Sequence, residues 1–216
     1  MSISKEWDWK KGSEDEWWFI PAEDVYYYVS RWKEKDFVKF LDLGCGIGRH
    51  SILFAQNGFD VYSFDLSETG INMLMRSAEK QNLKIHTRIG DMNNLPYETN
   101  TFDCLLAYHV ISHTDSVGIK HIINEICRVL KPDGEFFISL CSKESPTYKN
   151  GNFPKLDENT ILKTDGPEVN VPHYYSDVDS VRELLKDIKI IRLRHIQDFF
   201  DNCYGWHYFV HGKVAK

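Results

Sequence analysis

The sequence predicts an α/β fold, built on a doubly wound sheet that is mostly parallel and ends in an antiparallel strand pair. Apolar runs of strand length alternate with segments of helical period over residues 37–141, the pattern of a parallel sheet with helices on both faces. A glycine-rich loop at 44–48 joins the first strand of this series to a helix. Two late apolar runs, 188–196 and 206–214, have no helix between them and should therefore pair antiparallel.

Local sequence signals place the individual elements. Ser67 and Asp115 are expected to cap the helices that follow them, because their side-chain oxygens can accept from the first free N–H groups. Residues 131–134, Lys-Pro-Asp-Gly, are expected to stop a helix and turn the chain into a strand. Strands are expected at 37–43, 59–66, 83–89, 102–110 and 135–141, with helices at 21–35, from the glycine loop to about 57, after Ser67, after Asp115 and at 177–187.

Composition and charge narrow the classes of partner. Hydrophobic residues make up 42% of the chain and charged residues 27%, the values of a globular protein. The formal net charge of −6 and the lack of a Lys/Arg cluster argue against nucleic acid, because phosphate contacts need a basic surface. No stretch reaches the ~20 apolar residues of a membrane helix, and residues 1–16 lack the apolar region of a signal peptide. We therefore expect no membrane partner and a cytoplasmic monomer or homodimer.

The cysteines and histidines show no metal-binding pattern. None of the five cysteines lies in a C-x-x-C pair, so we expect reduced thiols. The nine histidines include no H-E-x-x-H or Cys/His spacing, so we expect no metal site.

The N-terminal segment is rich in large aromatic side chains, namely Trp7, Trp9, Trp17, Trp18 and Phe19. Exposing so many rings to water is unfavourable, so we expect this segment to be an arm anchored to the body of the domain. A second interpretation is a lid over a ligand site, and the two are compatible.

The glycine loop and the strand ends form the candidate binding site. In open sheets of this kind, ligands bind beyond the carboxyl ends of the parallel strands. Glycine permits a tight turn with positive φ and leaves no Cβ between the main chain and a ligand, while the next helix offers unpaired N–H groups. The residues at the strand ends are 42–48, Asp65, Gly90, Asp91, Tyr108 and His109.

The spacing of the glycines bears on which ligand binds there. The loop reads Gly44-x-Gly46-x-Gly48, whereas the dinucleotide fingerprint places its third glycine one position later, where this chain has Arg49. Asp65 ends the second strand, where a carboxylate can accept from both ribose hydroxyls, a feature shared by dinucleotide and S-adenosylmethionine sites. A solvated aspartate at a strand end is the alternative interpretation.

Asp91 ends the third strand and offers a second carboxylate at the same edge. It could accept from an exocyclic adenine amine, with the backbone N–H of Met92 available to a ring nitrogen. The alternative is an ordinary turn residue before Asn93.

Five motifs in register resemble the class I S-adenosylmethionine-dependent methyltransferases. The motifs are Leu-Asp-Leu-Gly-Cys-Gly-Ile-Gly at 41–48, Phe-Asp-Leu-Ser at 64–67, Gly-Asp-Met-Asn-Asn-Leu-Pro at 90–96, Phe-Asp at 102–103 and Arg-Val-Leu-Lys-Pro-Asp-Gly at 128–134. Residues 41–95 also resemble the tellurite-resistance type of small methyltransferase. The resemblance implies a Rossmann-like sheet, S-adenosylmethionine as cofactor and methyl transfer to a small molecule.

The same resemblance implies roles for the residues of these motifs. Gly44 and Gly46 would approach the methionine part of the cofactor, whose ammonium group Asp42 would hold directly or through water. Asp65 would bind the ribose, while Asp91 and Met92 would bind the adenine edge. Arg49 would contact the cofactor or only cap the loop. The full cofactor-binding set is Asp42, Gly44, Cys45, Gly46, Arg49, Asp65, Leu66, Asp91, Met92 and Tyr108.

Methyl transfer from a sulfonium is an in-line displacement, which needs alignment first and a base only for a protonated nucleophile. Orientation alone can lower the barrier by about 7–11 kcal/mol. His109 and His113 follow the fourth strand, and His173 lies in the proline-rich segment, so these three are the candidate catalytic residues. Structural roles are the alternative for each. Rings that could line the site by cation–π attraction are Trp18, Tyr26, Tyr175 and Trp206.

The chain has the length of one domain, which we expect to have four parts. These are an aromatic arm and helix at 1–36, a cofactor-binding core at 37–141, a cap insertion at 142–176 and a C-terminal helix and strand pair at 177–216. The cap holds four prolines and interrupts the alternation of strand and helix.

Other classes of function stay open beside a small-molecule methyltransferase. One is a nucleotide-dependent oxidoreductase on a similar sheet, and another is a non-catalytic protein that keeps the cofactor fold. RNA or protein methylation is disfavoured, because no Asn-Pro-Pro-Tyr type signature follows the fourth strand and the chain is acidic. The methyl acceptor has no readable motif.

Overall fold

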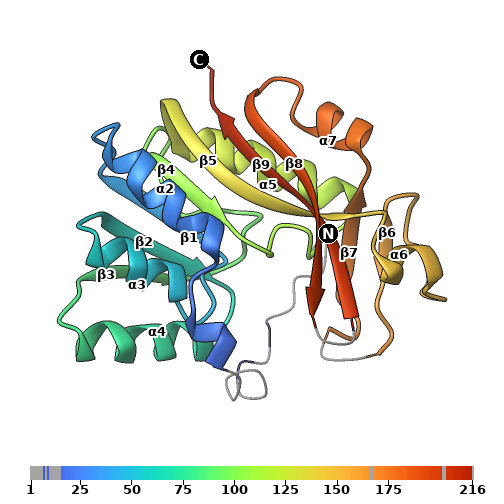
Figure 1. Ribbon diagram of the computed structural model, residues 1–216, viewed down its shortest axis with the longest axis horizontal. Coiled ribbons are helices and arrows are strands. Elements are labelled where there is room, and N and C mark those ends of the chain that lie inside the picture. Colours follow the sequence, from blue (N-terminus) through green and yellow to red (C-terminus); the bar gives the residue numbers. More distant parts are fainter. Residues whose placement is uncertain (1–6, 8, 10–15, 166–167, 201–202, 216) are drawn as a thin grey trace.

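The computed structural model describes residues 7, 9, 16–165, 168–200 and 203–215. Over these residues, nine strands form a mixed sheet with the order β3-β2-β1-β4-β5-β7-β6, while β9 pairs with β5 and β8 pairs with β9 (Figure 1). The neighbours from β3 to β5 are all parallel, as predicted. The strands are β1 (Lys39–Leu43), β2 (Asp60–Asp65), β3 (Ile85–Ile89), β4 (Phe102–Ala107), β5 (Leu130–Ser142), β6 (Thr160–Leu162), β7 (Pro172–Ser176), β8 (Lys189–Phe200) and β9 (Cys203–Lys213).

Helices cover both faces of the sheet (Figure 1). Phe40 of β1 packs in a cluster with residues of α2 and α3, whereas Leu41 and Leu43 pack with residues of α5 and α7. This follows from the alternation of side chains along a strand. The helices are the short 3-10 turn η1 (Glu16–Phe19), α2 (Glu23–Lys33), α3 (Arg49–Gln56), α4 (Glu68–Lys80), α5 (Ser116–Val129), α6 (Pro146–Asn150) and α7 (Val178–Leu184). None of the helices described is long and apolar enough to cross a membrane.

Two predicted helix caps are confirmed. The Ser67 hydroxyl accepts from the backbone N–H of Gly70 at 3.3 Å, at the start of α4. Asp115 Oδ1 accepts from the N–H groups of Val117 at 3.0 Å and Gly118 at 2.7 Å, at the start of α5. Both capping bonds supply partners for N–H groups that the first helical turn leaves free.

The C-terminal antiparallel pair is confirmed, and β9 also pairs antiparallel with β5. This second pairing inserts the C-terminal hairpin beside β5. It places His207 opposite Cys141, at the same end of β5 as the carboxyl ends of the parallel strands.

The expected turn at 131–134 is wrong in one respect, because β5 already begins at Leu130. The four residues form an irregularity inside the strand, where the β4 pairing shifts between Phe102 and Cys104 and Asp133 has a φ of 66°. β5 is therefore longer than the strand predicted at 135–141. β4 is shorter than predicted and ends at Ala107. That early end leaves Tyr108 and His109 in the loop beyond the sheet.

The segment at 142–176 contains more regular structure than expected. Its two short strands, β6 and β7, pair antiparallel. β7 also pairs parallel with the last two residues of β5, Cys141 and Ser142. The segment thus continues the sheet on one side of the carboxyl edge, and several of its side chains face the cavity described next.

Candidate active site

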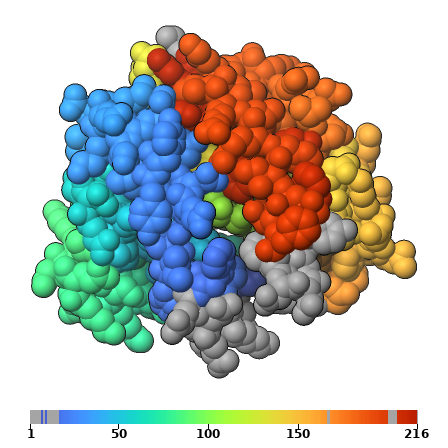
Figure 2. All heavy atoms as spheres, viewed as in Figure 1, coloured from blue at the N-terminus to red at the C-terminus, as the bar shows by residue number. Residues whose placement is uncertain are grey.

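A cavity of about 610 Å³ lies at the carboxyl edge of the parallel strands. Its size falls within the range of ligand pockets. Its lining comes from the N-terminal segment, the strand ends, the 142–176 segment and the C-terminal hairpin. Figure 2 shows the hollow on this face between the N-terminal segment in blue and the C-terminal hairpin in red. The cavity lies where the fold class predicts a ligand.

All the predicted site residues except one line this cavity. The residues brought together are Gly44, Cys45, Gly46, Arg49, Asp65, Leu66, Asp91, Met92, Tyr108, His109, His113 and His173. The exception is Asp42, which the structure places beneath the glycine loop with only 2% of its surface exposed. Its carboxylate accepts a hydrogen bond from Ser51 Oγ at 2.6 Å, and Ser63 Oγ donates in turn to Ser51 Oγ at 2.7 Å.

The glycine loop needs its glycines. Gly44 and Gly46 have φ of 71° and 53°, a region that other residues adopt only at a cost. A Cβ on Gly44 would lie 2.2 Å from Val110 Cγ2, and one on Gly46 would lie 2.3 Å from a ring carbon of Trp9. The loop backbone is therefore packed closely on both sides.

Asp65 holds the loop and the next helix together. Its Oδ2 accepts from the N–H of Gly46 at 2.7 Å, and its Oδ1 accepts from the N–H of Ser67 at 2.8 Å. Each carboxylate oxygen can accept more than one hydrogen bond, so the group can also serve a ligand. Burial raises the pKa of Asp65, with smaller opposing effects from these N–H donors.

Burial also raises the pKa of Asp42, to about 7. The hydrogen bond from Ser51 opposes this shift, while the negative charge of Asp65 adds to it. Two carboxylates near the glycine loop are thus both less stable as anions than free aspartate. A cation in the cavity would stabilise their charged forms.

Asp91 lies just beyond the carboxyl end of β3, at the same edge of the sheet. Its Oδ1 accepts from both the N–H and the side-chain amide of Asn93, each at 2.8 Å. These contacts make it a turn residue, as the alternative interpretation expects, and it also lines the cavity. The turn interpretation is therefore confirmed, and a contact with adenine stays a prediction.

Arg49 ties the aromatic arm to the loop. Its Nη1 donates to the carbonyl oxygen of Ile20 at 3.1 Å, and its guanidinium lies 5.7 Å from the ring centre of Trp18 and 5.8 Å from that of Tyr108. Burial lowers the pKa of Arg49. Its described contacts thus join the arm to the end of β4.

The arm tryptophans pack on one another and on the loop. The ring centres of Trp9 and Trp18 lie 5.4 Å apart in an edge-to-face arrangement, and Trp7 lies 6.0 Å from Trp18. These three and Trp17 line the cavity. Both interpretations of the arm, anchor and lid, fit these contacts.

Two of the four rings proposed for the pocket lie in its lining. Trp18 and Tyr175 are there. Tyr26 instead lies half exposed on α2, and the ring of Trp206 stacks near His195 at 4.7 Å, so neither is part of the lining.

His109 lines the cavity just beyond the end of β4. Its φ of 54° is held by a hydrogen bond from its N–H to Ser139 Oγ at 2.6 Å, and its Nδ1 lies 3.3 Å from the same oxygen. Desolvation by the surrounding protein, and next the neighbouring His207, lower the pKa of His109 well below its usual value. The ring is therefore neutral at pH 7 and accessible from the cavity.

The C-terminal hairpin adds a histidine that sequence reasoning missed. The ring of His207 lies 4.3 Å from that of His109, and its Nδ1 lies 3.7 Å from Asp198 Oδ2. Burial lowers the pKa of His207, but Asp198 and Cys141 raise it more, to about 9. Two adjacent histidines thus hold different charges at neutral pH, and only the register of β9 on β5 could have revealed the pair.

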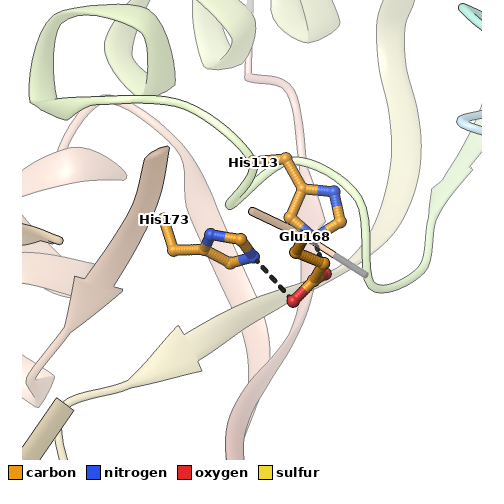
Figure 3. A group of neighbouring side chains, drawn as sticks. All are labelled: His113, Glu168 and His173. Atoms are coloured by element: carbon orange, nitrogen blue, oxygen red, sulfur yellow. Dashed lines mark ion pairs between the residues drawn. The ribbon is translucent and has the colours of Figure 1, made fainter. Parts of the chain in front are cut away.

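The other two predicted histidines meet at a carboxylate that was also missed. His113 Nε2 lies 3.2 Å from Glu168 Oε1, and His173 Nε2 lies 3.2 Å from Glu168 Oε2. Lys163 Nζ contacts the same carboxylate. Figure 3 shows both histidines pointing at Glu168 from opposite segments. Glu168 lies in a stretch without helix or strand period, so the sequence offered no signal for it.

The loop after β4 is bonded to the 142–176 segment, which explains why these histidines meet. The N–H of Tyr174 donates to the carbonyl oxygen of Ser112 at 2.8 Å, next to His113 in the chain. Ser116 Oγ donates to Asp157 Oδ1 at 2.8 Å. The first bond holds the loop against β7, which carries His173, and the second holds the start of α5 against the chain just before β6.

The comparisons with known proteins agree with this geometry. The family model described as a methyltransferase domain matches residues 40–134. A ubiquinone biosynthesis O-methyltransferase of Bartonella tribocorum is 30% identical over 128 residues, which are 59% of this chain and 50% of that protein. The probable S-adenosyl-L-methionine-dependent methyltransferase TehB of Haemophilus influenzae is 35% identical over 88 residues, 41% of this chain and 30% of that protein. The matches thus span half or less of the length of these relatives.

The fold is also similar to that of a solved structure. The crystal structure of a SAM-dependent methyltransferase from Methanosarcina mazei superposes with a TM-score of 0.72 at 18% identity, covering 82% of this chain and 92% of that one. The predicted Rossmann-like sheet is confirmed by this likeness and by the strand pairing described above. Residues 40–134 thus match a methyltransferase domain, and this part of the chain is similar to S-adenosylmethionine-dependent methyltransferases in sequence and in fold.

Proposed function

We propose that this chain transfers the methyl group of S-adenosylmethionine to a small-molecule acceptor by in-line displacement. The observation that carries the proposal is the single cavity, which joins the glycine loop and Asp65 at one end to His109 and His207 at the other. The acceptor's nucleophilic atom forms a bond to the methyl carbon while the carbon–sulfur bond breaks. The electron pair of that bond goes to sulfur, and S-adenosylhomocysteine leaves.

The roles at the cofactor end are those that the resemblance of its motifs implies. The backbone of Gly44 and Gly46 faces the methionine part, with Cys45 and Arg49 beside it, and the Asp65 carboxylate accepts from the ribose hydroxyls. Asp42 acts from beneath the loop, where its negative charge favours the ammonium without a direct contact. Of the other lining residues, Leu66, Asp91 and Met92 would face the adenosine part, and the main chain at Tyr108 would lie beside the ammonium or the sulfur.

The acceptor end offers a proton acceptor. In the tautomer with its proton on Nδ1, His109 donates to Ser139 Oγ and keeps a lone pair on Nε2. Because desolvation keeps this ring neutral, it can take the proton of a hydroxyl, amine or thiol acceptor. We assign His109 as the base, and His113 and His173 as side chains that contact the acceptor.

The arm and the 142–176 segment close the cavity on two sides. Water must be kept from the sulfonium for transfer to outcompete side reactions. The four arm tryptophans, with Ser145, Thr147 and Tyr175 of the other segment, are placed for that task. The division of the chain into arm, core, cap and C-terminal pair stays a prediction, as do a cytoplasmic location, a monomer or homodimer, and the lack of a nucleic-acid partner.

The oxidoreductase alternative receives no support from the family match, which is to a methyltransferase domain. The calorimetric test is direct. We expect the purified chain to bind S-adenosylhomocysteine at one site per chain and to bind NAD far more weakly. Preferential binding of NAD would contradict the proposal.

Catalysis is tested by release of S-adenosylhomocysteine from S-adenosylmethionine over a panel of small phenols, thiols, amines and carboxylates. The expected result is acceptor-dependent release. His109→Gln should lower kcat by about 10²–10⁴-fold for an acceptor that arrives protonated, with unchanged affinity for S-adenosylhomocysteine. Tight cofactor binding with no transfer to any acceptor would instead indicate a non-catalytic cofactor-binding protein.

A further inference from the structure

Three side chains from separate parts of the chain converge at the wall of the cavity. His113 lies in the loop after β4, Glu168 lies between β6 and β7, and His173 lies in β7 (Figure 3). One nitrogen from each ring and a carboxylate oxygen lie within 4.8 Å of one another. The sequence has no metal-ligand spacing, so we expect no metal site from it. These three residues lie far apart in the chain, and only the fold brings them together.

The hydrogen bonding of His173 leaves one of its nitrogens unsatisfied. Its Nδ1 lies 3.0 Å from the carbonyl oxygen of Val171. A carbonyl oxygen only accepts, so Nδ1 carries the proton. With its proton on Nδ1, the neutral ring has a lone pair on Nε2. This Nε2 is buried without a hydrogen-bond partner, in a side chain that is 2% exposed.

The lone pair of His173 Nε2 faces another acceptor, Glu168 Oε2, at 3.2 Å. Lys163 contacts the carboxylate and balances its charge, but it gives the nitrogen of His173 no partner. Two acceptors at this distance call for a cation between them.

We propose that His113, Glu168 and His173 form a binding site for a divalent transition-metal ion of the zinc class. Two imidazole nitrogens and one carboxylate are a donor set of open zinc sites, and imidazole disfavours magnesium and calcium. The Val171 carbonyl supplies the outer hydrogen bond that fixes the tautomer of a ligating histidine.

The position of the cluster suggests what the ion would do. All three residues line the cavity, and a site with three protein ligands keeps a fourth position for water or substrate. An oxygen, nitrogen or sulfur atom of the acceptor would take that position and lose its proton more readily. This second step, unlike the binding of the ion, rests on the proposed methyl transfer.

Metal binding is tested on the full chain without cofactor, so that its failure is separate from a failure of methyl transfer. The chelator-treated protein is titrated with Co²⁺, followed by its visible absorption, and with Zn²⁺ in competition. We expect one ion per chain. His113→Asn, Glu168→Gln and His173→Asn should each weaken binding by more than the ~10–100-fold that loss of an outer-shell contact costs.

A matched control is His86→Asn. His86 Nε2 also lies 3.2 Å from a carboxylate oxygen, Asp60 Oδ1, but this pair lies on β2 and β3 outside the cavity lining. The control should keep wild-type metal affinity. An equal loss in the control and the three ligand variants would overturn the proposal, because it would indicate general surface binding.

X-ray absorption of the zinc-loaded wild-type chain covers the case in which a variant fails to fold. The proposal predicts two imidazole rings in the first shell, with zinc–nitrogen distances of about 2.0–2.1 Å and no sulfur at about 2.3 Å. A sulfur shell would assign the ion to a cysteine and contradict the site. The same conclusion would follow if the wild-type chain took up no stoichiometric Co²⁺ or Zn²⁺.

Discussion

Two carboxylates near the amino edge of the parallel sheet have lowered pKa values, whereas two at the carboxyl edge have raised ones. At the amino edge, Asp103 accepts from the backbone N–H of Lys39 at 2.8 Å and from Lys131 Nζ at 2.6 Å, and these bonds lower its pKa although burial opposes them. Glu135, also near this edge, is held well below its usual pKa by His211, Arg31 and Lys35, again against burial. At the carboxyl edge, burial raises the pKa of both Asp42 and Asp65.

The difference lies in the partners. Glu135 is fully buried and accepts from Arg31 Nε and Nη2, each at 2.9 Å, from Trp32 Nε1 at 3.1 Å and from the His211 ring at 2.9 Å. The aspartates of the carboxyl edge receive hydrogen bonds only from neutral hydroxyl and N–H groups among the contacts described. The carboxylates at the amino edge thus stabilise the fold through ion pairs. The aspartates at the carboxyl edge have no such partner among the contacts described, and a positively charged ligand would stabilise their anions. Perturbed pKa values of this kind gather at functional sites.

The largest expected effect is on stability, from Glu135→Gln. Removing one charge of a buried ion pair leaves its partners uncompensated and costs about 3–5 kcal/mol, roughly 6–20 °C in Tm for a chain of this length. The depressed pKa of Glu135 means that its contribution is present above the usual glutamate pKa and is lost as pH falls below it. Thermal unfolding at pH 7 and pH 4 measures both.

The control for that variant is Glu183→Gln, which breaks an exposed pair with Lys186. Exposed pairs contribute little to stability because water and salt screen them, so Tm should hardly change. Equal loss of stability in the two variants would remove the distinction between the edges. So would a loss of cofactor affinity in folded Glu135→Gln.

The second expected effect concerns the arm, which covers the carboxyl edge. Deleting residues 1–18 should lower turnover strongly, because the four tryptophans that line the cavity are removed. If the arm is mainly a lid, Tm should fall by less than about 4 °C, which corresponds to roughly 1 kcal/mol. Parallel losses of Tm and turnover would instead make the arm part of the core.

A smaller effect is expected at the acceptor end. Asp198→Asn should lower the pKa of His207 from about 9 toward its usual value, because Asp198 is the first of the groups that raise it. The raised pKa means that the stabilisation is complete below about pH 6.5 and is lost as pH rises through 9. NMR titration of the ring protons measures the shift, and an unchanged pKa would show that Asp198 is not its cause.

The smallest effect is a proton balance. The pKa of Asp42 is about 7 in the folded chain, so near pH 6 its carboxyl is largely protonated, and a bound cation should lower the pKa and release part of a proton. Calorimetry of S-adenosylmethionine binding in buffers of different ionisation enthalpy measures this release. Asp42→Asn should reduce it, and identical release from the variant would assign the proton to another group.

The cavity lining around the glycine loop was largely predictable, because its residues are neighbours of strand ends in the sequence. The glycine loop, Asp65 and Asp91 all follow from the period of the strands and the rule for open sheets. Asp42 shows the limit of that rule. It lies one residue before a strand end, on the side that faces Ser51 beneath the loop, and it does not reach the cavity.

The acceptor end could not be predicted in the same way. His207 and Asp198 reach the cavity through the pairing of β9 with β5 and β8, and the register of such pairings is not written in a local pattern. Glu168 lies in a segment whose apolar residues follow neither the period of a helix nor that of a strand. The predicted histidines were found singly, while their partners were set by tertiary contacts.

The most direct test of the account compares one carboxylate from each edge, Asp65→Asn and Asp103→Asn, by calorimetric titration with S-adenosylhomocysteine. The account predicts that Asp65→Asn loses about 1.5–3 kcal/mol of binding free energy, the range for hydrogen bonds to a charged group. Asp103→Asn should lower Tm and keep wild-type affinity. Wild-type affinity in Asp65→Asn, or an equal loss in both variants, would contradict the assignment of the carboxyl edge to the cofactor.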